Sequence, residues 1–290
     1  MSSSLVHLRK DGILIHKEDA AVLLSLEEAL SVSKEIKDVL LFAEKKSKLE
    51  KLSHYISDWL HEIPAGVFSM GIDNGDPWEG PSHFVELTQA FLMAKSFVSQ
   101  SLYKLVMEEN TSVHLGSELP VDSVSWYEAL HFCNRLSDLL GFEPCYEFRN
   151  GAVHFMVNNN GFRLPTEAEW YWAAHCGVAS VYAGGDELER VSGWRKDSTH
   201  IPQVCAGAPN AFGLFDMSGL CFSWCYDSFA PFSMERKKNP VIVHETDVHK
   251  VCRGGAWNRS EWFSRIHFRC GMDAENGYDN VGIRLVRNAH

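Results

Sequence analysis

Apolar residues recur at helical spacing over the first part of the chain. Six positions lie close to one face of a helix, with no glycine or proline between them: Leu23, Leu26, Leu30, Ile36, Val39 and Leu40. This spacing predicts a helix over 17–58, within an N-terminal helical extension of residues 1–60. The pattern changes at 61–71, where Pro and Gly separate short apolar runs. Brief strand-like runs, long loops and a few helices follow, which predicts one large irregular domain over 61–290.

Two helices of this domain begin at capping boxes, in which a Ser or Thr side chain and a Glu three residues later satisfy each other's free backbone amides. The first begins at Ser125 with Glu128 and is expected to end at Gly141. The second begins at Thr166 with Glu169. Their predicted buried faces hold Leu130, Cys133 and Leu136 in the first helix, and Trp170, Ala173 and Ala174 in the second.

The C-terminal part has the pattern of β-strands joined by long connections. KVCR (250–253) is expected to form one strand and VGIRLV (281–286) another. In VGIRLV, apolar positions alternate with a face that is predicted to be exposed and that holds Gly282, Arg284 and Val286.

Between these two strands lies WNRSEWFSRIHFR (257–269), in which four aromatic residues stand among three arginines and a histidine. If SRIHFR forms a strand, Arg265 and His267 lie on one face and Ile266 on the other. His267 is then expected to be more exposed than Phe268. Tyr, Trp, Arg and His together are typical of binding surfaces, because they offer large contact areas with few rotatable bonds.

Charge and hydropathy argue against a nucleic-acid partner and against a membrane-spanning segment. The chain has 27 basic and 38 acidic side chains and a formal net charge of -11. A nucleic-acid interface needs concentrated basic side chains, so nucleic acid is not expected as a partner. No run approaches the roughly 18 consecutive apolar residues of a membrane span. The N-terminus lacks the apolar core of a signal peptide. The expected location is therefore cytoplasmic, unless a targeting segment was removed from this sequence.

Known metal and catalytic motifs are absent from the sequence. The eight cysteines are scattered and form no CxxC pair, and HExxH does not occur. Zinc sites need ligands at closer spacing, so we expect buried free thiols and no cofactor. Glu167 stands between Thr166 and Glu169, but the capping box accounts for this group without catalysis. There is also no GxSxG and no GxGxxG motif.

Six ordered segments resemble the formylglycine-generating-enzyme, or sulfatase-modifying factor, family. They are IPAGVFSMG (63–71), PVDSVSWYEALHFCNRL (120–136), GFRLPTEAEWYWAA (161–174), NAFGLFDMSG (210–219), VCRGGAWN (251–258) and NVGIRLVR (280–287). The resemblance implies an α+β, C-type-lectin-like fold with a small twisted sheet, two main helices and much irregular loop. It covers nearly everything after the N-terminal extension.

The resemblance also shows where this chain departs from the oxidase members. They use two cysteines shortly after the RGG segment to bind copper and oxidise a substrate cysteine, and thiolates are the ligands that Cu(I) prefers. Counted from Arg253-Gly254-Gly255, those positions hold Arg259 and Ser264. We therefore expect the chain not to be an enzyme of this type.

The calcium-binding turn of the family is also incomplete. Asp216 and Gly219 match its pattern, but the position of its final Glu is Ser223. One strong oxygen ligand is missing, and Asp216 is expected to cap backbone amides instead.

The C-terminus resembles the variable proteins of diversity-generating retroelements, the treponemal variable protein among them, which share this fold. Their framework matches Arg253, Gly254, Gly255, Trp257, Arg265, Ile266, Arg269, Gly282, Arg284 and Leu285. In this framework, Trp257 is expected to be a core residue, and Arg265 and Arg269 to make structural hydrogen bonds. The resemblance implies a variable ligand-binding region at about 253–287. Its candidate contact residues are Arg259, Ser260, Trp262, Phe263, His267, Phe268, Met272, Asp273 and Tyr278. Tyr278 lies in a Gly/Asn/Asp-rich loop and is expected to be exposed.

Two functions follow from these residues. The first is a non-catalytic, ligand-binding bacterial protein that recognises a protein or glycan partner. The variable-protein resemblance then implies display at the cell surface or outer membrane, through a lipid anchor that this sequence does not contain. The alternative is a formylglycine-generating oxidase that acts on protein cysteine through another site.

Overall fold

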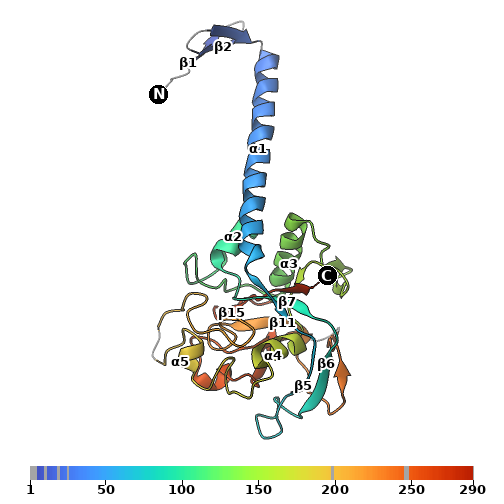
Figure 1. The fold of residues 1–290 in the computed structure, drawn as a ribbon. Helices are drawn as coiled ribbons and strands as arrows, with labels where there is room; N and C mark the ends of the chain where they lie inside the picture. The colour runs from blue at the N-terminus through green and yellow to red at the C-terminus, as the bar shows by residue number, and fades with distance from the viewer. Residues whose placement is uncertain are drawn as a thin grey trace. The chain divides into compact units, whose positions relative to one another are not determined.

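The computed structural model describes residues 5–9, 12–17, 20–24, 26–196, 199–244 and 248–289. The chain divides into two compact units, residues 1–53 and 54–290. The first contains an antiparallel meander of β1 (Leu5–Arg9), β2 (Gly12–Lys17) and β3 (Ala20–Leu24). The long helix α1 (Leu26–Ser57) follows it in sequence (Figure 1).

The helix predicted over 17–58 begins later than expected. Its first described residues belong to β2 and β3, where Ile15 pairs with Val22 and His16 with Ala21. Residues 18, 19 and 25 lie outside the described part. β-Branched residues favour the extended backbone, and Ile13, Ile15 and Val22 are the available signal in this part of the chain. On α1, four residues of the predicted stripe are more than half exposed, namely Leu30, Ile36, Val39 and Leu40.

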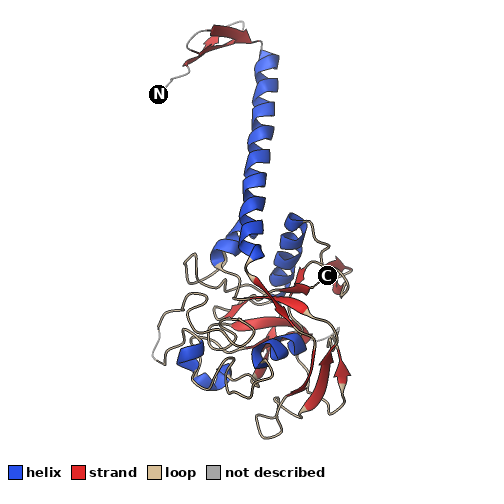
Figure 2. Ribbon diagram, in the orientation of Figure 1, coloured by secondary structure: helices blue, strands red, loops and turns tan. Residues whose placement is uncertain are grey.

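The second unit is built from small sheets joined by long loops (Figure 2). One sheet has the order β10 (Phe162–Arg163), β16 (Val286–Asn288), β7 (Phe91–Ala94), β4 (Leu60–Ile63). Another has the order β14 (Arg269–Asp273), β13 (His249–Arg253), β11 (Phe222–Ser228), β15 (Val281–Gly282). A third contains β12 (Lys237–Lys238), β6 (His83–Leu87) and β5 (Gly66–Met70), and β8 (Tyr146–Arg149) pairs with β9 (Ala152–Phe155).

Beyond the end of α1, the described part of this unit holds the α-helices α2 (Gln100–Met107), α3 (Trp126–Leu140), α4 (Glu167–His175) and α5 (Leu188–Val191). Both predicted capping boxes are confirmed, Ser125 with Glu128 on α3 and Thr166 with Glu169 on α4. Gly141 ends α3 in the left-handed conformation, as predicted. The faces predicted to be buried are buried on both helices. No helix in the described ranges is both long and apolar enough to cross a bilayer.

The two C-terminal strand predictions have different outcomes. KVCR lies in β13, as expected. VGIRLV is not one half-buried strand, because β15 ends at Gly282 and β16 begins at Val286, in the other sheet. The connecting residues are covered on both sides, and Arg284 is fully buried. Its guanidinium donates to the carbonyls of Ala94 and Phe215 at 2.7 and 2.6 Å.

Candidate functional site

The segment between β13 and β14 is a turn structure, not a strand. Residues Glu261–Ser264 form a short 3₁₀ helix, η1, and β14 begins only at Arg269. The amide of Phe268 donates to the carbonyl of Arg265 at 3.1 Å, which closes a turn. The amide of Ile266 donates to the carbonyl of Val181 at 2.9 Å. SRIHFR is therefore not a strand, and the assignment of its side chains to two strand faces does not apply.

Glu167 binds the arginines at both ends of this segment, Arg253 of β13 and Arg269 of β14. Arg253 Nε donates to Glu167 Oε1 at 2.9 Å, and Arg269 Nε and Nη2 donate to its two oxygens at 2.7 Å each. All three side chains are buried. Burial alone would raise the pKa of Glu167, but the charges of Arg269 and Arg253 hold it below its usual value. The prediction for Glu167 was wrong: Thr166 and Glu169 form the capping box, and Glu167 is the shared partner of two arginines.

Arg253 also fixes the turn itself. Its Nη1 donates to the carbonyls of Ile266, His267 and Phe268 at 3.2, 3.1 and 3.1 Å. Three carbonyls on one guanidinium leave this turn little freedom, because moving any of them breaks a hydrogen bond that is at least partly buried. Arg269 further donates to the carbonyl of Ala230 at 2.8 Å.

Trp262 is the largest exposed side chain of the predicted site, with 52% of its surface exposed. Cζ of Arg265 lies 3.6 Å from the centre of the indole ring, within cation–π range. Arg265 in turn donates to Glu79 Oε1 at 2.6 Å and Oε2 at 3.2 Å, and Glu79 is buried. The structural role predicted for Arg265, like that for Arg269, is confirmed.

The sequence prediction missed Trp78, which precedes Glu79. Trp78 is 46% exposed, and the centres of its ring and of the Phe229 ring are 4.9 Å apart. The carbonyl of Trp78 accepts a hydrogen bond from Arg269 Nη1 at 3.4 Å. A tryptophan in the Pro- and Gly-rich run DPWEGP was the available signal, since loops of this kind seldom bury large side chains.

The remaining predicted contact residues differ in exposure. Arg259 and Ser260 are exposed, whereas Phe263, His267, Phe268, Met272, Asp273 and Tyr278 are partly buried. Phe263 and Phe268 pack edge to face at 5.0 Å, so both help to hold the turn. Met272 and Asp273 lie on β14, and the ring of Tyr278 lies near Trp224. Within the described residues, no hydrogen bond or ring contact joins these last three to Trp262. Tyr278 was expected to be exposed, but it is partly buried.

His267 is a neutral, partly buried residue. Its Nδ1 lies 3.2 Å from the hydroxyl of Tyr171. Burial, followed by the charge of Arg253, lowers the pKa of His267 to about 4. His267 and Phe268 are both partly buried and neither lies on a strand at 264–268, so the strand-face reason for expecting His267 to be the more exposed does not hold.

Comparison with known proteins identifies the family. The model of the sulfatase-modifying factor enzyme 1-like domain matches residues 58–289. The chain belongs to this family. It is 31% identical to the formylglycine-generating enzyme of Streptomyces coelicolor, over 78% of this chain and 88% of that protein. It is 27% identical to the chaperone protein LppX of Paenibacillus barcinonensis, over 68% of this chain and 80% of that protein.

A solved structure, the Treponema denticola variable protein 1, superimposes with a TM-score of 0.73. The two chains are 26% identical, and the match covers 79% of this chain and 94% of that chain. The C-type-lectin-like fold of the sulfatase-modifying factor family and the resemblance to the variable proteins are both confirmed.

Arg259 and Ser264 stand at the positions where the resemblance to the oxidases implies a pair of cysteines. Arg259 is exposed, while Ser264 is fully buried beneath Gly255. All eight cysteines are free thiols, as predicted, although three of them are only partly buried. Cys252 and Cys270 face each other across β13 and β14. Burial raises the pKa of Cys270 to about 12 and that of Cys252 well above its usual value. Both sulfurs are therefore protonated thiols, not thiolates.

The family's calcium turn also has a different role here. Asp216 adopts a left-handed backbone, with φ of 56°, and its Oδ2 accepts the amide hydrogen of Cys205 at 2.6 Å. Asp216 thus holds a neighbouring loop by one backbone amide. Ser223, at the position of the final ligand, is buried in β11. In the described ranges, no three His, Cys, Asp or Glu side chains gather in a way that could hold a metal ion.

Proposed function

We propose that the chain is a non-catalytic binding protein whose C-terminal surface recognises a partner protein. The binding surface comprises Trp262, Arg265, Arg259 and Ser260, together with Trp78 from the neighbouring loop. The observation that carries the proposal is an exposed Trp262 fixed beneath Arg265, which is itself anchored by the buried Glu79. Side chains held in place before binding lose little entropy in the complex, and Trp and Arg are the residues that dominate binding energies.

The shape of the surface favours a protein over a glycan. Neither the cavity of about 940 Å³ nor that of about 320 Å³ is lined by Trp262, Arg259 or Ser260. Two half-exposed indoles suit a partner that covers a large area. A glycan remains the alternative partner.

The chemistry of the segment supports a role without catalysis. Arg259 and Ser264 provide no thiolate for copper, and the nearby Cys252 and Cys270 are held as thiols. Incubation of the purified chain with copper(I) and a CxPxR peptide is therefore expected to leave the peptide cysteine unchanged. Formation of formylglycine, detected by mass spectrometry, would contradict the proposal.

Binding can be tested by probing a protein microarray and a glycan microarray with the purified chain. Trp262→Ala should weaken binding of any protein hit at least tenfold, because central Trp residues contribute most to interface energy. Phe84→Ala removes an aromatic side chain from β6 that is at least as exposed as Trp262, and it should leave binding unchanged. A hit that depends on Phe84 and not on Trp262 would show that another surface binds. Single variants are preferable to a joint change of Trp262 and Phe263, since Phe263 packs against Phe268.

A further inference from the structure

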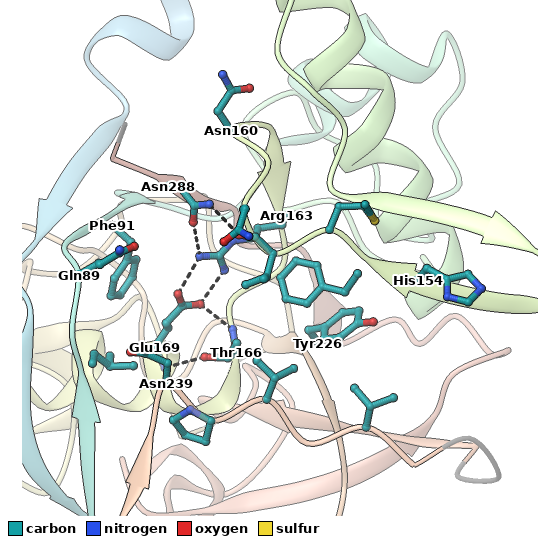
Figure 3. A pocket seen from close by; sticks show the side chains of 18 of the residues that line it. Gln89, Phe91, His154, Asn160, Arg163, Thr166, Glu169, Tyr226, Asn239 and Asn288 are labelled. Carbon is teal, nitrogen blue, oxygen red and sulfur yellow. Dashed lines mark hydrogen bonds and ion pairs between the residues drawn. The ribbon is translucent and has the colours of Figure 1, made fainter.

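A cavity of about 940 Å³ lies in the second unit, lined by none of the residues predicted for the C-terminal surface (Figure 3). Arg163 and Glu169 form a buried ion pair in its lining, with two hydrogen bonds of 2.7 and 2.8 Å. Asn288 accepts a third hydrogen bond from Arg163 at 3.0 Å. The rings of Phe91 and Tyr226 lie on either side of this pair in Figure 3. The cavity therefore combines a polar base with aromatic walls.

The cavity follows the edge of β9, not one of its faces. Every residue from Val153 to Asn158 lines it. Side chains alternate between the two faces of a strand, so a cavity over one face would touch only every second residue. Consecutive contacts mean that the backbone edge of β9 borders the cavity.

The hairpin geometry leaves that edge unpaired. Asn150 and Gly151 both have positive φ, 53° and 76°, which is the pattern of a two-residue type I′ turn. Such a turn is closed by a hydrogen-bonded pair, Arg149 and Ala152, and hydrogen-bonded pairs then alternate along the hairpin. The amide of Met156 donates to the carbonyl of Cys145 at 2.8 Å, so this pair falls where the alternation places a hydrogen-bonded pair.

It follows that the amides and carbonyls of Val153 and Phe155 point away from β8, toward the cavity.

The segment at 239–243 also borders the cavity and also has unpaired backbone groups. Ile242 is tied to β11 by hydrogen bonds with Asp227 and Ser228. Its neighbours Val241 and Val243 line the cavity, and within the described part of the chain their backbone groups have no hydrogen-bond partner. Two extended segments thus offer unpaired backbone to the same space.

The charges around the cavity cancel. Arg163 and Glu169 neutralise each other, and the other polar side chains that line it, apart from Thr166, His154 and the Tyr226 phenol, are amides: Gln89, Asn158, Asn160, Asn239 and Asn288. The rest of the lining is apolar. Such a lining favours an uncharged ligand that carries both amide groups and apolar side chains.

We propose that this cavity is a second binding site, which takes an uncharged peptide segment in extended conformation. The peptide adds to the free edge of β9 by main-chain hydrogen bonds to Val153 and Phe155, the mode known as β-augmentation. Its apolar side chains contact Phe91, Tyr226 and Val241. At about 3.3 Å per residue, four residues of peptide match the length of β9. The site does not depend on the function proposed for the C-terminal surface.

The probe is an array of blocked hexapeptides composed only of uncharged residues, with affinities of the hits measured by fluorescence polarisation. Ala90→Trp fills the cavity, and Val243→Arg places a charge on its exposed wall. Each should weaken binding at least tenfold. Ala152→Trp is the matched control, because Ala152 lies on the same hairpin, is exposed and does not line the cavity. N-methylation of alternate amides in the peptide should also weaken binding tenfold, and bound peptide should slow hydrogen exchange over 153–157.

Five outcomes would overturn the proposal. The wild-type chain could bind none of the peptides, or folded Ala90→Trp and Val243→Arg variants could bind them as well as the control does. N-methylation could leave the affinity unchanged, which would exclude pairing with a strand edge. Light scattering could show a wild-type dimer that Ala90→Trp converts to monomer, which would make a second copy of this chain the occupant. Binding of a glycan array in place of the peptides would identify a sugar site.

Discussion

Arg265 donates two hydrogen bonds to the buried carboxylate of Glu79 and covers the exposed ring of Trp262. These two charged residues are 186 positions apart in the sequence. The pair joins the loop that carries Trp78 to the 3₁₀ helix that carries Trp262. Because Glu79 is almost completely buried, it gives Arg265 one fixed position, and Arg265 in turn fixes the indole.

Removal of Arg265 should destabilise the fold as well as the surface. In Arg265→Met, Glu79 stays buried without its partner, so the free energy of unfolding should fall by about 3 kcal/mol. Urea denaturation measures this change. Arg236→Met is the control, because Arg236 and Glu86 form a more exposed pair that should contribute less than about 1 kcal/mol. Equal losses in the two variants would show that burial does not strengthen the dependence on Arg265.

Substitution of Glu167, the carboxylate that binds Arg253 and Arg269, should strongly lower the free energy of unfolding. Glu167→Gln removes the charge that Arg253 and Arg269 share, and we expect a loss of about 3–5 kcal/mol in the free energy of unfolding. Hydrogen exchange should rise over residues 265–273, since both arginines hold that segment. The control Glu147→Gln changes a carboxylate in an exposed pair with Arg149. A Glu167→Gln variant as stable as this control would contradict the assigned role.

Local signals in the sequence predicted α3 and α4, and long-range contacts decided much of the rest. The capping boxes of α3 and α4 involve residues three apart, so the sequence alone contains all the information they need. The turn at 265–268 has no such local determinant. It depends on the carbonyl of Val181 and on three hydrogen bonds from Arg253, neither of which the alternation of SRIHFR can indicate.

The candidate site could be predicted only in part for the same reason. Arg259, Ser260 and Trp262 are exposed as expected, because they lie in the short segment between the RGG run and the end of η1. Trp78 was missed because only the tertiary contacts of Glu79 and Arg269 bring its loop to this surface. The alternation of VGIRLV places Arg284 on an exposed strand face. Arg284 is instead fully buried, where its guanidinium donates to two carbonyls from distant parts of the chain.

His267 should make the protein less stable in acid. Its pKa in the folded state is about 4, below the ordinary 6.5, so the unfolded chain binds more protons between these values. Stability is then lost as the pH falls from about 6.5 to about 4. His267→Gln keeps a polar partner for Tyr171 and cannot be protonated. The stability of this variant relative to wild type should therefore increase as the pH falls from about 6.5 to about 4. Thermal unfolding from pH 4 to pH 7 measures the difference, with the exposed His154→Gln as control. A difference that does not vary with pH would contradict the assignment.

Asp216 should have the opposite effect on pH dependence. Burial raises its pKa to about 6, although the amide of Cys205 and the charge of Arg284 act against burial. The folded chain therefore binds more protons than the unfolded chain, and stability is lost as the pH rises from about 4 to about 6. Asp216→Asn keeps an acceptor for Cys205, and Asn tolerates the left-handed backbone. Wild type and variant should have similar unfolding free energies at pH 4. Above pH 6 the variant should be more stable by up to about 3 kcal/mol, because each pKa unit corresponds to about 1.4 kcal/mol. Urea denaturation at pH 4, 5, 6 and 7, with the exposed Asp58→Asn as control, measures this. A wild type that is the more stable protein at pH 7 would mean that Arg284 holds Asp216 as a buried carboxylate.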